Sequence, residues 1–213
     1  MTSMADPSET QTPLTALPEN AGVDAAVAAA RRVIEALLHA GGNSAAEMVQ
    51  VAERLDQISA HLAEHAPDRE ERLVDMWRGE GVTRHDPVTG PENAIAPPLH
   101  LAGLPDGSVR GTVTLGLAYQ GPPGSVHGGV SALLLDHALG VANDWGPGPA
   151  GMTGTLTLRY HRVTPLFREL TVVARQVSFS GRKIKTTGEI TVDGEVCVSA
   201  DGLFIDAFID RPR

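Results

Sequence analysis

The chain has 213 residues, 42% of them hydrophobic, which suits one globular domain with an appendage. No apolar run reaches the ~20 residues of a membrane span, and the N-terminus lacks the apolar core of a secretory signal. The formal charge is -9, and residues 1–105 hold 16 acidic and 7 basic side chains, which argues against a nucleic-acid partner there. We expect no membrane partner, since no apolar run is long enough to span a membrane. A single cysteine fits a cytoplasmic protein without an internal disulfide.

Two segments make up the predicted N-terminal part. Residues 1–20 are rich in Ser, Thr and Pro and predict a disordered segment. Residues 21–80 predict a helical extension, with a first helix over 24–40 and a second that Asn43 or Ser44 caps. A short third helix is predicted around Leu73, Val74 and Trp77. The second helix carries an apolar stripe, which we interpret as a packing face, at Met48, Val51, Leu55, Ile58 and Leu62.

The rest of the chain predicts a linker and one larger domain. Residues 81–98 are rich in turn formers and predict a linker loop. Residues 99–213 predict an α+β domain, in which a strand over 109–115 precedes a long apolar helix over 128–142. A curved antiparallel sheet is expected to wrap this helix, and a second copy of the chain to cover the rest of it. Four further strands, the last two joined by an Asp-Gly hairpin turn, are predicted over 153–160, 170–179, 183–192 and 195–204.

Asp136 is the residue that points most directly to a function. It lies within the apolar stretch 128–142, where a carboxylate is costly unless it is hydrogen-bonded, paired or functional. The stretch opens after His127 with Gly128-Gly129, and backbone N–H groups at a helix start can stabilise developing negative charge. An acid and an anion site on one element favour catalysis.

Three motifs in this region resemble a known family. Residues 119–129 read YQGPPGSVHGG, Asp136 follows His127 by nine positions, and residues 159–166 read RYHRVTPL. Together they resemble the hotdog-fold acyl-CoA thioesterases, of the phenylacetate-pathway type and the thioesterase superfamily members, over about residues 95–206. The resemblance implies a hotdog fold and hydrolysis of acyl-CoA to free acid and CoA without a cofactor. It also implies a homodimer or higher homo-oligomer with active sites between the subunits.

The resemblance implies a role for each motif residue. Asp136 acts as nucleophile or general base, and the backbone N–H of the glycine after the histidine polarises the thioester carbonyl. We expect the Gly129 N–H to stabilise the oxyanion, Gly128 to contact the substrate, and His127 to shape the loop or transfer a proton. A hydroxyl that positions the water is expected from Thr153 of the partner subunit.

Other functions remain open at this point. Gly121 lies six positions before His127, where many relatives carry Asn, and this departure keeps open a non-catalytic acyl-CoA-binding module. A hotdog hydratase or dehydratase is a third possibility, but the Asp/His pair of that chemistry is not found. Ser131 is not in a Gly-x-Ser-x-Gly motif, and the eight histidines show no metal-ligand spacing with Cys or acids, so we expect no metal site.

One basic patch lies in the otherwise neutral half of the chain. It comprises Arg182, Lys183 and Lys185, which include both lysines of the protein. It is either a solvated strand face or a contact for CoA phosphates, and we predict the second, with Arg159, Arg162 or Arg168 as the next candidates. Cys197 lies in an alternating run and is predicted to be a core thiol.

Overall fold

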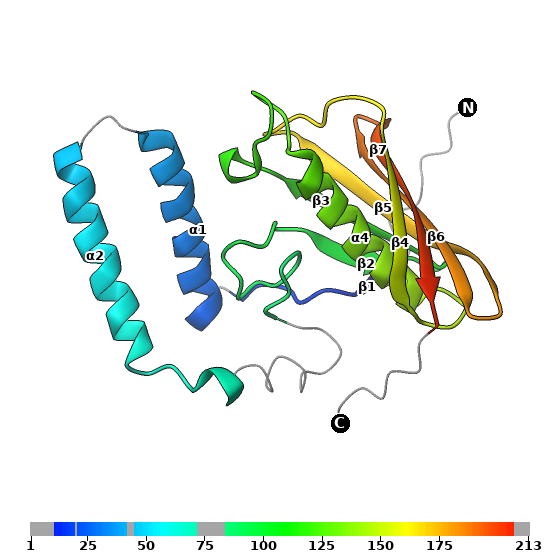
Figure 1. Ribbon diagram of the computed structural model, residues 1–213, viewed down its shortest axis with the longest axis horizontal. Coiled ribbons are helices and arrows are strands. Elements are labelled where there is room, and N and C mark those ends of the chain that lie inside the picture. Colours follow the sequence, from blue (N-terminus) through cyan, green and yellow to red (C-terminus); the bar gives the residue numbers. More distant parts are fainter. Residues whose placement is uncertain (1–10, 20, 42–44, 72–83, 207–213) are drawn as a thin grey trace.

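One antiparallel sheet curves around one long helix in the computed structural model, which describes residues 11–19, 21–41, 45–71 and 84–206 (Figure 1). The described strands follow the order β1-β2-β3-β5-β6-β7-β4, so β4 forms one edge of the sheet. Helix α4 (Gly128–Trp145) contacts the sheet from β2 to β4, which confirms the predicted α+β architecture. The strands are β1 (Thr12–Pro13), β2 (His100–Gly103), β3 (Ser108–Thr114), β4 (Met152–Tyr160), β5 (Glu169–Ser180), β6 (Lys183–Val192) and β7 (Glu195–Ile205).

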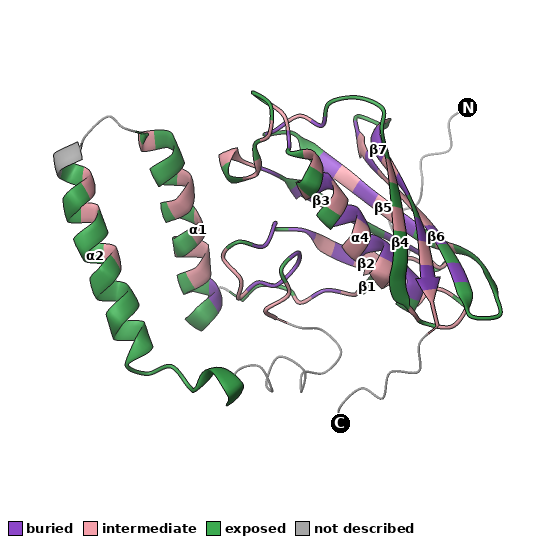
Figure 2. Cartoon of the chain, in the orientation of Figure 1, coloured by how far each residue is buried: buried purple, intermediate pink, exposed green. Residues whose placement is uncertain are grey.

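The hydrophobic core lies between α4 and the sheet. Leu134, Leu135, Ala138 and Leu139 recur on one face of α4 and are fully buried. Burying one leucine contributes about 1.5–3 kcal/mol relative to leaving it exposed. Cys197 is buried in the same core, as predicted. Figure 2 shows the buried band on α4 and on the strands, whose buried residues include Val172, Ile184, Ile190, Val198 and Phe204.

The opposite face of α4 is not covered within one chain. Leu133 is 39% exposed, and Asp136 and His137 are half-buried. Edge strand β4 beside it is exposed at both ends, at Met152 and Tyr160. The sheet of one chain reaches only one side of the helix, as expected, and cover of the remaining face by a second copy stays a prediction.

Strand β4 contains a β-bulge around Gly154. Thr153 pairs with Phe204, and Leu156 pairs with Gly202, so both β4 side chains face α4 although they lie three residues apart. An unbroken strand alternates its side chains with period two and would turn one of the pair away from the helix. The extra residue of the bulge therefore sets the direction of Thr153.

Residues 11–19 lie against the sheet, which corrects the expectation of disorder over residues 1–20. Strand β1 pairs antiparallel with β2, and the Leu14 N–H donates to the Leu101 carbonyl at 2.9 Å. Thr15 is buried, and its hydroxyl accepts from the Leu101 N–H at 3.0 Å. An edge strand is held by backbone hydrogen bonds, which need no apolar composition, so composition alone did not predict it. The remainder of the 1–20 segment lies outside the described residues.

The helical extension is confirmed as α1 (Gly22–Ala40) and α2 (Ala45–Ala63), and Figure 1 shows α1 between α2 and the sheet. Helix α1 ends at Gly41, whose φ of 56° suits glycine. The predicted caps Asn43 and Ser44 and the predicted third helix fall outside the described residues. None of the described helices combines the length and the hydropathy that crossing a membrane requires.

The apolar stripe of α2 is covered only in part. Its first members are half-buried, whereas Ile58 is 57% and Leu62 is 64% exposed. Figure 2 shows the same trend, with α2 largely exposed along its length. The interpretation of the stripe as a packing face therefore holds for its first half within this chain, at Met48, Val51 and Leu55.

The predicted linker loop docks the helical extension on the sheet domain. Arg84 donates from Nη2 to both carboxylate oxygens of Asp24, at 2.6 and 2.7 Å, and from Nε to Glu92 at 2.6 Å. Arg31 of α1 donates to two backbone carbonyls of the loop, at 2.7 and 3.2 Å. The hydrogen bond from Arg84 and a second from the Glu19 N–H lower the pKa of Asp24 below its usual value.

Candidate active site

The candidate nucleophile Asp136 lies on the uncovered face of α4, about two turns after the helix start. The Thr153 hydroxyl donates to Asp136 Oδ1 at 3.1 Å. Both residues belong to the same chain, which corrects the expectation that Thr153 of the partner subunit reaches this carboxylate. The reason is geometric, since β4 runs beside α4 of its own chain and its bulge turns Thr153 toward the helix.

The helix start has His127 as its N-cap. The His127 ring accepts the Gly129 N–H on Nδ1 at 3.0 Å, so its own proton lies on Nε2. The expected oxyanion donor, the Gly129 N–H, is thus already bonded inside the chain. Within the described part of the chain, the Gly128 N–H bonds no acceptor. The geometry therefore favours Gly128 over Gly129 as the donor to a substrate.

Tyr160 holds this helix start against β4, a role that the sequence did not suggest. Its hydroxyl donates to the Gly128 carbonyl at 3.0 Å. The motif that contains Tyr160 indicated the end of a strand, but no periodicity indicated that the ring would reach the first residue of the helix. Tyr160 fixes the orientation of the peptide groups that start α4.

The two halves of the candidate site lie far apart within one chain. Gly128 and Asp136 are separated by eight residues, which in an α-helix is about 12 Å along the axis. A thioester carbonyl needs its donor within ~3 Å of the oxygen and its nucleophile within ~3.5 Å of the carbon. One substrate cannot satisfy both conditions inside a single subunit.

Gly121, the departure from the family pattern, has a steric cause. A Cβ at this position would lie 2.7 Å from His127 Cα, closer than side chains pack. The close approach is fixed by backbone hydrogen bonds, from the Gly121 N–H to Ser125 O and from the His127 N–H to Tyr119 O, both at 2.9 Å. No asparagine fits this loop, so any group that orients a water or carbonyl comes from elsewhere.

His137 contacts the loop before β2 rather than Asp136. Its Nε2 lies 3.3 Å from the Thr89 hydroxyl, and its Nδ1 lies 3.6 Å from Asp86 Oδ1. Burial lowers the pKa of His137, against the opposing effect of Asp86 and Asp136. This agrees with the prediction of a packing residue, and among the described residues no imidazole is hydrogen-bonded or ion-paired with the carboxylate of Asp136.

The basic patch is not brought to Asp136 within the chain. In β6, Ile184 pairs with Phe204, which pairs with Thr153, and the first two are buried against α4. Lys183 and Lys185 flank Ile184 and, by alternation, project from the outer face of the sheet. Arg182 Nε donates to the Asp206 carbonyl at 3.0 Å.

The alternative cations differ in how they are engaged. Arg162 pairs with Glu195, and Arg168 pairs with Asp193. Arg159 lies on β4 between Leu158 and Tyr160, so it projects from the other face of the strand than the Tyr160 ring. The contact with CoA phosphates stays a prediction for all of these residues.

A candidate metal-ligand cluster lies outside this site and corrects the statement that no histidine has metal-ligand spacing. His61, Glu64 and His65, at the end of α2, each offer one ligand atom within 4.8 Å of the others. Their i, i+3, i+4 spacing was visible in the sequence, but the helix end that brings them together was not.

Comparison with known proteins agrees with this fold. Residues 123–199, which include α4, β4, β5 and β6 and the start of β7, match the family described as the thioesterase superfamily. Residues 14–71 match a family described as the N-terminal helical domain of the hypothetical protein RHA1_ro05818. A crystal structure of the thioesterase superfamily protein RHA08564 is 62% identical, over 94% of this chain and 98% of that one, with a TM-score of 0.85.

More distant relatives share part of the chain. Acyl-coenzyme A thioesterase THEM4 of Bos taurus is 35% identical over 88 residues, which are 40% of this chain. The chain spans about a third of that relative's length, 35%. Zebrafish thioesterase superfamily member 2 has the same fold, at 15% identity and a TM-score of 0.51, over 62% of this chain and 94% of that one. By its match to RHA08564 along nearly the whole of both sequences, the chain belongs to the thioesterase superfamily.

Proposed function

We propose that this protein is an acyl-CoA thioesterase that hydrolyses the thioester to a free acid and CoA. The observation that carries the proposal is the Asp136–Thr153 pair on the uncovered face of α4. A helix start with an available Gly128 N–H supports it, because thioester hydrolysis needs both an acceptor of protons and a donor to the oxyanion. The partial match to a bovine acyl-coenzyme A thioesterase supports acyl-CoA as the substrate class.

The reaction assigns one task to each group. Asp136 either deprotonates the attacking water or attacks the carbonyl carbon to form a mixed anhydride, which water then hydrolyses. The Thr153 hydroxyl holds Oδ1 and so fixes the carboxylate plane. The Gly128 N–H stabilises the oxyanion, for which one such donor contributes roughly 3 kcal/mol. The bond to sulfur then breaks, and CoA leaves as the thiol once its thiolate is protonated.

A homodimer follows from the separation of the two half-sites. Pairing of two sheets at their β4 edges would cover the exposed face of α4 in both copies. An antiparallel arrangement of the two helices would then bring Gly128 of one copy toward Asp136 of the other. Each dimer would hold two composite active sites.

The runner-up function is a non-catalytic acyl-CoA-binding module. Gly121 favours it, because the loop has no space for the amide that many relatives carry at this position. The two functions predict the same binding of acyl-CoA and differ in turnover.

Release of free thiol from short, long and aromatic acyl-CoAs, followed with a thiol-reactive dye, tests the proposal. We expect steady turnover that falls ~100-fold or more in kcat for Asp136→Asn, which keeps shape and removes the charge. Asp201→Asn is the matched control, because Asp201 is exposed on β7 and has no part in the site. Binding of acyl-CoA without thiol release, or a normal kcat in folded Asp136→Asn, would favour the binding module.

A further inference from the structure

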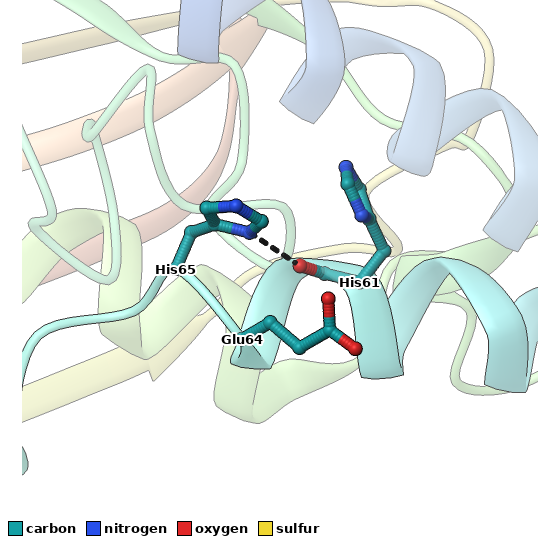
Figure 3. Close-up of side chains that lie close together, drawn as sticks. All are labelled: His61, Glu64 and His65. Carbon is teal, nitrogen blue, oxygen red and sulfur yellow. Dashed lines mark hydrogen bonds between the residues drawn. The ribbon is translucent and has the colours of Figure 1, made fainter.

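A cluster of three metal-ligating side chains lies at the C-terminal end of α2, outside the candidate active site. His61 lies in the last turn of the helix, and Glu64 and His65 follow directly after it. Spacings of three and four residues place side chains on one face of a helical turn. Figure 3 shows the two rings and the carboxylate gathered at this turn.

The end of the helix orients one of the rings. The His65 N–H donates to the Leu62 carbonyl at 3.2 Å, three residues back, instead of to the His61 carbonyl four residues back. The His61 carbonyl is one of the four that a helix leaves unpaired at its end. It accepts from His65 Nδ1 at 3.1 Å, the dashed line in Figure 3.

This hydrogen bond fixes the state of the His65 ring. A carbonyl oxygen only accepts, so the proton of the neutral ring lies on Nδ1 and the lone pair lies on Nε2. Histidine ligands of metals are oriented in the same way, by an N–H donated from the second ring nitrogen to a carbonyl or carboxylate. The hydrogen bond to the His61 carbonyl therefore leaves Nε2 as the nitrogen of the neutral His65 ring that would bind a metal.

We propose that His61, Glu64 and His65 form a surface site for one divalent transition-metal ion. One ligand atom of each lies within 4.8 Å of the others. The ligands of a tetrahedral site with bonds of ~2.0–2.1 Å lie roughly 3.3 Å apart, so small rotations of exposed side chains close the site. Water completes the coordination at the open side.

The donor set selects the class of metal. Two imidazole nitrogens and one carboxylate oxygen suit Zn²⁺, Co²⁺, Ni²⁺ and Cu²⁺, whereas Ca²⁺ and Mg²⁺ prefer oxygen ligands. The negative end of the helix dipole also favours a cation at this place. The bound ion links the last turn of α2 to the two residues that follow, and so stabilises the end of a largely exposed helix.

Metal titration of the full-length, untagged chain after treatment with a chelator tests the site. We expect one Co²⁺ per chain, seen by its visible absorption, and displacement of Co²⁺ by Zn²⁺. His61→Ala and His65→Ala should each weaken Co²⁺ binding by ~10-fold or more. Loss of a residue that only hydrogen-bonds a metal ligand already lowers affinity by ~10–100-fold, and here the ligand itself is removed. Glu64→Gln should weaken it less, because an amide oxygen remains. Zn²⁺ should also slow hydrogen exchange at the end of α2.

The matched control is His39→Ala. His39 lies at the end of α1 and pairs with Glu35 at 3.3 Å. It is thus an exposed histidine beside an acid, but no second imidazole joins the pair among the described residues. This variant should bind Co²⁺ as the unaltered chain does. Absence of stoichiometric binding would overturn the proposal, as would binding that persists in the His61→Ala, His65→Ala double variant. Because these residues lie outside the candidate active site, thioester hydrolysis is expected to be the same in all five variants.

Discussion

At the scale of the residue, the candidate site depends on a single hydroxyl whose position the structure defines. Thr153 is the one described side chain that bonds Asp136. A hydrogen bond to a charged group contributes about 1.5–3 kcal/mol, which is large enough to set the orientation of the carboxylate.

We expect Thr153→Val to lower kcat by ~10–100-fold, because the loss of 1.5–3 kcal/mol in orientation appears at the transition state. KM should change little, since the substitution conserves shape and does not touch the CoA moiety. Thr153→Ser, which keeps the hydroxyl, should recover most of the rate. Steady-state kinetics of the three forms decide the point, and equal kcat in the Val variant would remove Thr153 from the reaction.

Gly121 gives a prediction about stability. Gly121→Ala should destabilise the fold by ~1–3 kcal/mol, because its Cβ would lie 2.7 Å from His127 Cα and the backbone must shift. Gly140→Ala is the matched control, since Gly140 lies inside α4 with nothing within 4 Å of its added Cβ. The control should gain ~0.5–1 kcal/mol from helix propensity. Urea denaturation of both variants measures the difference, and equal effects would contradict the steric argument.

At the scale of the element, we expect the docking of α1 on the loop 84–98 to depend on pH. In the folded chain the pKa of Asp24 lies below its usual value of 3.8, mainly because of the hydrogen bond from Arg84. Its contribution to stability is therefore fully present above about pH 3.8 and is lost as the pH falls through the folded pKa. The unfolded chain takes up the proton more readily than the folded one over this range.

We expect Asp24→Asn to lower stability by a constant amount from neutral pH down to mildly acidic pH. The difference in free energy of unfolding between the two proteins should then narrow as the pH falls below 3.8 and through the lower folded pKa, because protonated Asp24 carries no charge, like Asn. Thermal unfolding of both chains across this range gives the curve. A gap that stays constant into strong acid would show that the charge of Asp24 is not what stabilises the docking.

Elements with a strong periodic pattern could be predicted from the sequence, and elements held by backbone pairing could not. The apolar stretch that became α4 and the Asp-Gly turn before β7 are local signals, and Asp193 and Gly194 have the positive φ values, 52° and 80°, of such a turn. Strand β1 has no apolar signal. The bulge at Gly154 depends on how β4 pairs with β7, which the β4 sequence alone does not contain.

The candidate site was likewise predictable from the sequence only in part. Asp136 and the helix start were identified by chemistry and spacing, but the hydrogen bond of the Gly129 N–H to His127 depends on the N-cap conformation, with φ and ψ of -62° and 135°. Which subunit supplies Thr153 depends on how strand and helix pack, and the expectation of the partner subunit, taken from the resemblance, was wrong for this reason.

At the scale of the whole molecule, a composite site makes activity a property of pairs. Gly128→Pro removes the proposed donor without breaking the helix, because proline is favoured at the first helical position and His127 already has the extended conformation that precedes a proline. Gly128→Pro and Asp136→Asn should each be nearly inactive as homodimers.

Co-expression of these two variants should restore about a quarter of the wild-type activity. Random pairing makes half of the dimers mixed, and one of the two sites in each mixed dimer receives Gly128 and Asp136 intact. Light scattering should give twice the chain mass of 22.4 kDa. An inactive mixture of correctly assembled dimers would place both groups of each site in one subunit and refute the composite arrangement.

The bulge in β4 makes the site sensitive to a count of codons as well as to their identity. Loss of the Gly154 codon removes no reactive group and restores regular alternation, in which Thr153 stands two positions before Leu156 and its hydroxyl still faces α4. Removal of two codons, those of Gly154 and Thr155, would make Thr153 the neighbour of Leu156 and turn it to the outer face, because the side-chain period is two. Deletions between Thr153 and Leu156 should therefore follow a parity rule, in which loss of one residue preserves the hydroxyl contact and loss of two abolishes it.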